Sequence, residues 1–217
     1  MALALFDLDN TLIAGDSDYS WGQFVVSNRL VDAGEYEARN NRFYDDYVNG
    51  ELDVEAYLSF VLEPLKQFSQ TELDELHAKF MRDYITPMLL PKASQLIEKH
   101  RSQGDLPVVI TSTNRFITAP IAEKLGVKHL IASEPEKIDN RYTGNIVGTP
   151  CFREGKIVCL NAWLEQHGQS IDKAWFYSDS LNDIPLLEHV ENPVAVDPDE
   201  ALAAKAALSD WPIISLR

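Results

Sequence analysis

The segment ALALFDLDNTL, residues 2–12, predicts where the sheet begins and which polar residues follow its first strand. Its first part, Ala2 to Phe6, is a short apolar run that stops at an acidic cluster, which predicts a buried β-strand whose carboxyl end opens into a polar loop. Asp7 and Asp9 follow directly and flank Leu8. At a strand end, a spacing of two residues can direct both carboxylates toward the same crevice.

Beyond this strand, the apolar spacing becomes helical from Ser17 to about Tyr84. Apolar and aromatic residues recur every three or four positions and predict about four helices with no strand between them. Asn49-Gly50 marks a break between two of these helices. Thr71 and Asp74 resemble a capping box in which Asp replaces the usual Glu. We therefore expect an all-helical segment here.

After Pro87 strand and helix patterns alternate, which predicts an α/β fold with a doubly wound, Rossmann-like parallel sheet. Residues 140–148 are expected to form a small hairpin or loop. Ligands of such sheets bind at the carboxyl ends of the strands, so residues that follow different strands should meet in one crevice. The expected strands are Leu106–Thr111, His129–Ser133, Trp175–Ser178 and Pro193–Val196, and the expected helices include Glu154–His167 and Asn182–Glu188.

A second acidic pair, Asp179 and Asp183, follows the expected strand 175–178 and precedes a helix. Taken singly, an acidic residue after a strand is usually a helix cap or a solvated turn residue. Three or four carboxylates that converge from two strand ends instead indicate a hard cation with oxygen ligands, and Mg²⁺ fits best.

These motifs resemble those of the haloacid dehalogenase-like phosphohydrolases. Asp7-Leu8-Asp9-Asn10-Thr11 matches the family's DxDxT signature, and Asp179 to Asp183 matches its late DxxxD motif. Thr111 resembles the phosphate-binding Ser or Thr, and Lys156 resembles the essential lysine. The resemblance covers nearly the whole chain. It implies a core of residues 1–15 and 86–217 with an inserted helical cap of residues 16–85, as in the subgroup that contains phosphoserine phosphatases.

The resemblance also implies a mechanism. Asp7 would attack phosphorus and become phosphorylated, while Asp9 would act first as acid and then as base. Thr111 and Lys156 would hold the phosphoryl oxygens, with Ser112 as a further donor. Mg²⁺ would be bound by the Asp7 side chain, the Asp9 carbonyl and Asp179, with Asp183 orienting these ligands or contacting them through water. Asn182 is a further expected substrate contact.

The substrate is expected to be a small phosphorylated metabolite chosen by the cap. Asp16 is placed where phosphoserine phosphatases carry the acidic residue that meets the substrate amine, and Asp18 and Trp21 follow it. Residues 16–21 also resemble a branch associated with histidinol-phosphate phosphatase activity, so histidinol phosphate is the first expectation and phosphoserine the second. Phosphoserine would need a partner for its carboxylate, for which Arg39 or Arg42 is available.

Composition and charge argue against several classes of protein. A net charge of -15 argues against nucleic-acid binding, since affinity for the phosphate backbone depends on Lys and Arg. No apolar stretch is long enough to span a membrane, so a cytoplasmic enzyme is expected. Cys151 and Cys159 lack a zinc-site spacing and are expected to be free thiols. A phosphotransferase that uses the same motifs and a non-catalytic protein that binds a phosphorylated ligand stay open.

Overall fold

A computed structural model describes residues 2–217 and has a six-stranded parallel sheet as its centre. The strand order is β3-β2-β1-β6-β7-β8. The predicted α/β class and parallel sheet are confirmed. The strands are β1 (Leu3–Phe6), β2 (Leu106–Ile110), β3 (His129–Ile131), β6 (Trp175–Ser178), β7 (Asn192–Val196) and β8 (Ile213–Ile214).

Strand β1 lies between β2 and β6, and its register determines what meets at the carboxyl edge. Phe6 is level with Val109 of β2 and with Tyr177 of β6. The residues that follow these three strands therefore emerge side by side. All four residues of β1 are buried, as expected for a parallel strand covered on both faces.

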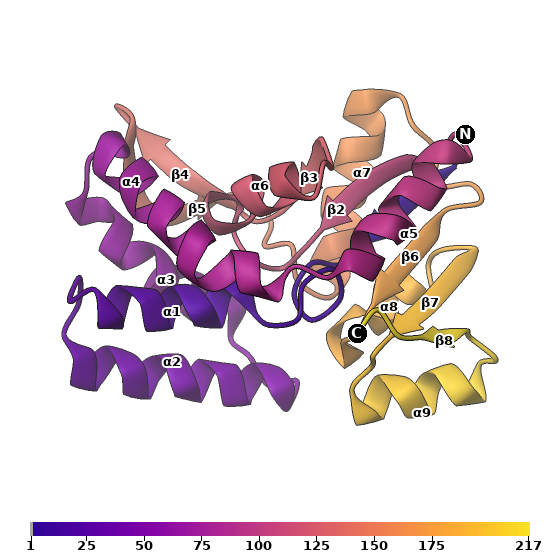
Figure 1. The fold of residues 1–217 in the computed structure, drawn as a ribbon, viewed down its shortest axis with the longest axis horizontal. Coiled ribbons are helices and arrows are strands. Elements are labelled where there is room, and N and C mark those ends of the chain that lie inside the picture. The colour runs from indigo at the N-terminus through magenta and orange to yellow at the C-terminus, as the bar shows by residue number, and fades with distance from the viewer. Residues whose placement is uncertain (1) are drawn as a thin grey trace.

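Helices cover both faces of the sheet (Figure 1). Ala4 and Phe6 belong to a core shared with α5 and α6, whereas Leu3 and Leu5 belong to a core shared with α7, α8 and α9, as the two-residue period of a strand requires. The helices are α5 (Pro91–Ser102), α6 (Arg115–Lys124), α7 (Glu154–His167), α8 (Ile184–Leu187) and α9 (Glu200–Leu208), and the 3-10 helix η4 (Leu181–Asp183) precedes α8.

The segment between β1 and α5 is helical, as predicted, and lies to one side of the sheet in Figure 1. Its capping box is formed by Ser69 and Glu72, so the predicted box at Thr71 and Asp74 was placed two residues too late. The helices are α1 (Ser17–Ser27), α2 (Ala33–Val48), α3 (Val54–Leu62) and α4 (Gln70–Phe80), with the short turns η1 (Glu63–Gln67), η2 (Met81–Ile85) and η3 (Thr86–Met88).

Two adjacent linkers join this helical segment to the sheet. Ile13 and Leu89 form an isolated antiparallel bridge, and the Ala14 N–H donates to the Met88 carbonyl at 2.8 Å. We retain the division into a core of residues 1–15 and 86–217 and a cap of residues 16–85 as a proposal; residue 1 lies outside the described residues. From here on, residues 16–85 are called the cap.

A hairpin of β4 (Glu134–Ile138) and β5 (Arg141–Val147) packs against α3 and η1 of the cap. It begins earlier than the predicted excursion at residues 140–148. Gly144 has a φ of +89° and approaches Lys66 so closely that a Cβ would lie 2.9 Å from the Lys66 Cδ. No helix within residues 2–217 is both long enough and apolar enough to cross a membrane.

Candidate active site

Asp7 and Lys156 form a buried ion pair at the carboxyl edge of the sheet. The Lys156 ammonium lies 2.7 Å from Oδ1 of Asp7 and 2.7 Å from a carboxylate oxygen of Asp183. Lys156 is 1% exposed and Asp7 5%. The Ser178 hydroxyl, at the end of β6, donates to Asp183 at 2.7 Å. The structure thus brings three of the predicted site residues together from β1, α7 and η4.

Burial and the neighbouring charges shift the pKa values of both members of this ion pair. Burial raises the pKa of Asp7 well above its usual range, Lys156 opposes the shift, and the neighbouring carboxylates add to it. Burial lowers the pKa of Lys156, but Asp183 and Asp7 outweigh this effect, so that the net shift is upward. Lys156 is therefore held as a cation between two carboxylates.

Asp9 has a hydrogen bond to each carboxylate oxygen. Its Oδ1 accepts from the Ser17 N–H at 2.6 Å, and its Oδ2 accepts from the Thr113 hydroxyl at 2.9 Å. Burial raises the pKa of Asp9, and these hydrogen bonds oppose the shift. Thr113 was missed in the sequence, although it follows Thr111 at the same two-residue spacing that separates Asp9 from Asp7.

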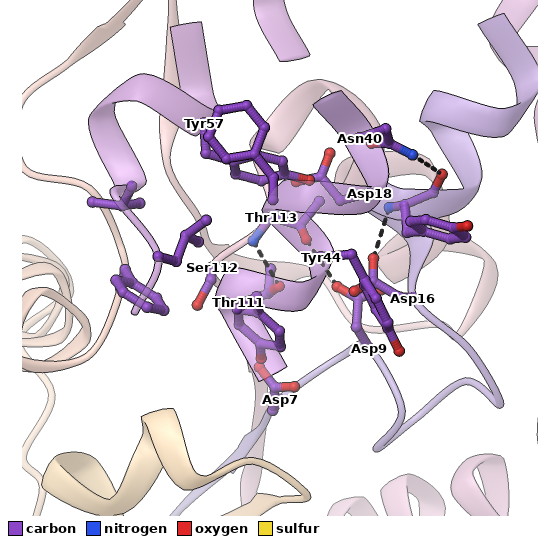
Figure 2. A pocket seen from close by; sticks show the side chains of 16 residues that line it. Asp7, Asp9, Asp16, Asp18, Asn40, Tyr44, Tyr57, Thr111, Ser112 and Thr113 are labelled. Carbon is purple, nitrogen blue, oxygen red and sulfur yellow. Dashed lines mark hydrogen bonds between the residues drawn. The ribbon is translucent and has the colours of Figure 1, made fainter. Parts of the chain in front are cut away.

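Thr111 and Ser112 follow β2 and line the same pocket as Asp7 and Asp9 (Figure 2). The Thr111 hydroxyl accepts from the Thr113 N–H at 3.2 Å, and the Thr111 N–H donates to the Ile131 carbonyl of β3 at 3.0 Å. These bonds hold the turn after β2 in place. Both residues face the pocket beside Asp7, where a phosphoryl group would have to lie for attack by this carboxylate.

Asp179 lies on the other side of Asp7, after β6. Its Oδ1 accepts from the Thr11 hydroxyl at 2.8 Å. Burial raises its pKa to about 7; the Thr11 hydrogen bond opposes this shift and Asp183 adds to it. Thr11, the last residue of the Asp7 motif, thereby connects the two acidic motifs that are 168 positions apart.

The carboxylates suit a divalent metal chemically. They are oxygen donors, Asp7 and Asp183 are buried, and Asp179 is half-buried. Burial raises the pKa values of Asp7 and Asp179, and the neighbouring carboxylates add to both shifts. Within residues 2–217, no three His, Cys, Asp or Glu side chains are placed to hold a metal together. A metal bound by Asp7 and Asp179 would therefore also need backbone, water or substrate oxygens. The use of the Asp9 carbonyl stays a prediction.

The pocket extends from these residues into the cap and encloses about 580 Å³, part of it open to solvent. Figure 2 shows a row of carboxylates that runs from Asp7 through Asp9 and Asp16 to Asp18, which lies beside Tyr57. Six of the lining side chains are aromatic. The lining side chains from the cap are Asp16, Asp18, Tyr19, Asn40, Phe43, Tyr44, Tyr47, Leu52, Val54 and Tyr57, and Phe152 comes from the segment before α7.

Asp16 and Asp18 lie at the start of α1, where Asp16 is half-buried and Asp18 is buried. Asp16 is the N-cap of α1 and accepts from the Tyr19 N–H at 2.8 Å. Burial raises its pKa to about 7, and Asp9 adds to the shift. Asp18 is 4% exposed, and its Oδ1 has no hydrogen-bond partner within residues 2–217. Burial and then Asp16 raise the pKa of Asp18, and the Tyr57 hydroxyl opposes them.

Two predicted substrate contacts lie elsewhere. Trp21 is 1% exposed and packs against Phe24 and Phe80 inside the cap, so it does not line the pocket. Asn182 donates from Nδ2 to the Tyr47 carbonyl and accepts from Arg153. It therefore joins the cap to the core instead of lining the pocket. Both residues are removed from the substrate contacts that we propose.

The two arginines considered for a substrate carboxylate are also outside the pocket. Arg39 lies over the Phe60 ring, 4.6 Å from its centre, and is exposed. Arg42 is exposed. Neither lines the pocket that holds Asp7, and among residues 2–217 no other Lys or Arg lines it.

We expect Thr113→Val to lower kcat by about tenfold, because a charged hydrogen bond of roughly 1.5 kcal/mol or more would be lost from Asp9. KM should change little, since Thr113 acts through Asp9. Steady-state kinetics of Thr113→Val and Thr113→Ser check this prediction. The Ser variant retains the hydroxyl and should recover most of the rate; equal losses in both variants would contradict the assigned hydrogen bond.

Comparison with known proteins identifies the family of this chain. A sequence model of the family described as haloacid dehalogenase-like hydrolase matches residues 4–188. The chain is 48% identical over 219 residues to the histidinol-phosphatase of Neisseria meningitidis serogroup C (strain 8013), with 99% of both chains covered. It is 27% identical to the phosphoserine phosphatase SerB1 of Mycobacterium tuberculosis (strain H37Rv), covering 100% of this chain and 71% of the relative.

Solved structures show the same fold. A protein of unknown function from Bordetella pertussis Tohama I superimposes with a TM-score of 0.94 at 45% identity, covering 100% of this chain and 99% of the other. A substrate-bound phosphoserine phosphatase superimposes with a TM-score of 0.72 at 18% identity, covering 100% and 93%. At that identity the second likeness concerns the fold alone.

Proposed function

The chain belongs to the haloacid dehalogenase-like hydrolase family and is a phosphatase, and from this premise we propose that it hydrolyses histidinol phosphate through an aspartyl phosphate formed on Asp7. The observation that carries the choice of substrate is the pair of carboxylates on the cap side of the pocket, the half-buried Asp16 and the buried Asp18. No Lys or Arg of residues 2–217 lines this pocket.

The phosphoryl transfer follows from the positions of Asp7 and Asp9. Lys156 holds Oδ1 of Asp7, which leaves Oδ2 as the oxygen that bonds to phosphorus. The bond from phosphorus to the leaving oxygen breaks, and Asp9 gives that oxygen a proton. A raised pKa of Asp9 suits this acid role. Water then attacks the phosphorus of the aspartyl phosphate, Asp9 takes its proton, and Asp7 is released.

Charge stabilisation falls to Lys156 and the turn after β2. Lys156, Thr111 and Ser112 would donate hydrogen bonds to the phosphoryl oxygens, because they lie beside Asp7 at the same edge of the sheet. Mg²⁺ held by Asp7, Asp179 and the Asp9 carbonyl would screen the repulsion between the phosphate dianion and the carboxylates. Asp183 would keep Lys156 and this ligand set oriented.

The leaving group is selected by charge. Histidinol carries an ammonium group and an imidazole, and both suit a pocket with two carboxylates and several tyrosine rings. Phosphoserine carries a carboxylate, which would face Asp16 and Asp18 without a cation to receive it. The relative that is 48% identical and named histidinol-phosphatase agrees with this choice. Phosphoserine is accordingly the weaker substrate in this proposal.

We expect Asp18→Asn to raise KM for histidinol phosphate by about 10- to 100-fold, because a charge-assisted hydrogen bond of roughly 1.5 to 3 kcal/mol would be lost. The variant should be as stable as the wild type or more so, since the buried Oδ1 of Asp18 lacks a partner within residues 2–217. Phosphate release against substrate concentration checks KM, and thermal unfolding checks stability.

The matched control for this variant is Asp53→Asn, which changes an exposed aspartate of the same cap that caps α3. Its KM should equal that of the wild type. If Asp18→Asn and Asp53→Asn had the same KM, Asp18 would not contact the leaving group, and the cation-selective part of the proposal would be wrong.

A further inference from the structure

Arg153, just before α7, has an unfavourable backbone conformation. Its φ of 50° and ψ of -122° lie in a region that L residues rarely adopt. Strained residues of this kind persist where the surroundings hold them, and they gather at functional sites. Lys156 follows three residues later in the first turn of α7. The strained residue therefore lies about one helical turn before the residue whose ammonium holds Asp7.

The side chain of Arg153 connects the cap to the core. One of its terminal nitrogens donates to the Gly50 carbonyl, and its Nε donates to Oδ1 of Asn182 at 3.0 Å. The guanidinium also lies over the Phe152 ring, which lines the pocket. Gly50 has a φ of +72°, and a Cβ at this position would lie 3.2 Å from the guanidinium. The contact thus needs a residue without a side chain at position 50.

The contact continues along the loop that carries Asp179 and Asp183. Asn182 donates from Nδ2 to the Tyr47 carbonyl at 3.2 Å, and the Tyr47 hydroxyl donates to Ser180 Oγ at 3.2 Å. Tyr47 lies in the last turn of α2, and Gly50 follows that helix. The Tyr47 carbonyl also accepts from the Gly50 N–H at 3.0 Å, so Asn182 adds a second donor to it. The end of a helix favours a nearby cation, and Arg153 provides one from the core.

We propose that Arg153 is a positioning residue that fixes the carboxyl end of cap helix α2 on the loop of residues 179–183. By holding both Gly50 and Asn182, it sets the distance between the cap-side carboxylates and Asp7, and so the fit of the leaving group. The strained backbone is kept because it aims the guanidinium across the domain boundary. This inference rests on the proposed phosphatase activity but not on the identity of the substrate.

The test uses Arg153→Gly, because glycine adopts a positive φ without strain and the variant should fold. We expect kcat/KM for histidinol phosphate to fall by about 10- to 100-fold, since a small misplacement of substrate is costly, while the melting temperature stays equal or rises. Hydrolysis of acetyl phosphate, which has no group that reaches the cap carboxylates, should fall less than about threefold by the same argument.

A second readout is independent of turnover. Amide hydrogen exchange of residues 48–53 should be faster in Arg153→Gly than in the wild type, because the end of α2 loses its partner in the core. The matched control is Arg29→Gly, which removes an exposed arginine of the cap that also has a positive φ of 57°. This control should leave exchange at residues 48–53 and both rates as in the wild type.

The inference is overturned if Arg153→Gly leaves exchange at residues 48–53 unchanged. It is also overturned if histidinol phosphate and acetyl phosphate lose rate equally, which would place the effect on Lys156 alone. A wild type that hydrolyses no histidinol phosphate would count against the proposed substrate and not against this inference. The exchange experiment would still decide the role of Arg153.

Discussion

Replacing Asp7 with asparagine should reduce phosphate release by about 10⁴-fold or more, the scale seen when an enzyme loses its nucleophile. The amide side chain would fill the same space but would not form an acyl phosphate. The fold should survive, because Lys156 keeps Asp183 as an ion-pair partner. Burial is the largest cause of the raised pKa of Asp7, so a neutral amide at this position should leave stability equal or higher.

Rapid acid quenching during turnover, followed by peptide mass analysis, measures the intermediate. Phosphate should be found on the peptide that contains Asp7 in the wild type and be missing in Asp7→Asn. A phosphorylated peptide that lacks Asp7, or a variant with near wild-type rates, would show that another group accepts the phosphoryl. Thermal unfolding of both proteins distinguishes a loss of catalytic activity from a loss of folded protein.

The second large effect is expected for Lys156→Met. This change leaves Asp7 and Asp183 buried without their cation, and breaking a buried pair on one side costs about 3 to 5 kcal/mol. For a chain of this size, the melting temperature should fall by roughly 10 °C. At a temperature where the variant is folded, kcat should fall by about 10²- to 10³-fold, because one hydrogen-bond donor to the phosphoryl oxygens is lost.

The stability deficit of Lys156→Met should shrink as the pH falls. Without the ammonium that lowers it, the pKa of Asp7, already raised by burial, rises further above its value in the unfolded chain. The folded state then binds more protons than the unfolded state below the folded pKa, so its stability increases as pH falls. Denaturant unfolding at pH 7 and pH 5 measures this difference between variant and wild type.

Lys205→Met serves as the control for this variant. Lys205 pairs with Glu188 at the surface, where an ion pair contributes at most about 1 kcal/mol. If both variants lost the same free energy of unfolding, the buried Lys156 ion pairs would stabilise the fold no more than the surface pair of Lys205. A Lys156 variant as stable as the wild type would contradict the buried charge cluster derived from the structure.

The sequence indicated much of the catalytic half of the site because that half lies at strand ends. Asp7, Thr111 and Asp179 each follow a strand of a parallel sheet. The pairing of β1 with β2 and with β6 brings these strand ends together. Such residues can be predicted from the alternation of strands and helices. Thr113 was missed because its role depends on reaching Asp9 across 104 positions, which no local pattern records.

The cap half was harder to predict. Trp21 lies one helical turn from Asp18 and was expected to share its direction, but its large ring is buried in the aromatic core of the cap. Arg153 and Tyr57 carry no motif, and their importance arises only when α7 and α3 are placed against the pocket. Packing between elements distant in sequence, not periodicity, decides the position of these residues.

The most direct test of the account compares the kcat/KM of the wild type for histidinol phosphate and for phosphoserine at saturating Mg²⁺. We expect histidinol phosphate to be preferred by at least about 100-fold, because the phosphoserine carboxylate faces Asp16 and Asp18 without a cation and roughly 3 kcal/mol separates the two leaving groups. Equal values, or a preference for phosphoserine, would contradict the conclusion that this pocket selects a cationic leaving group.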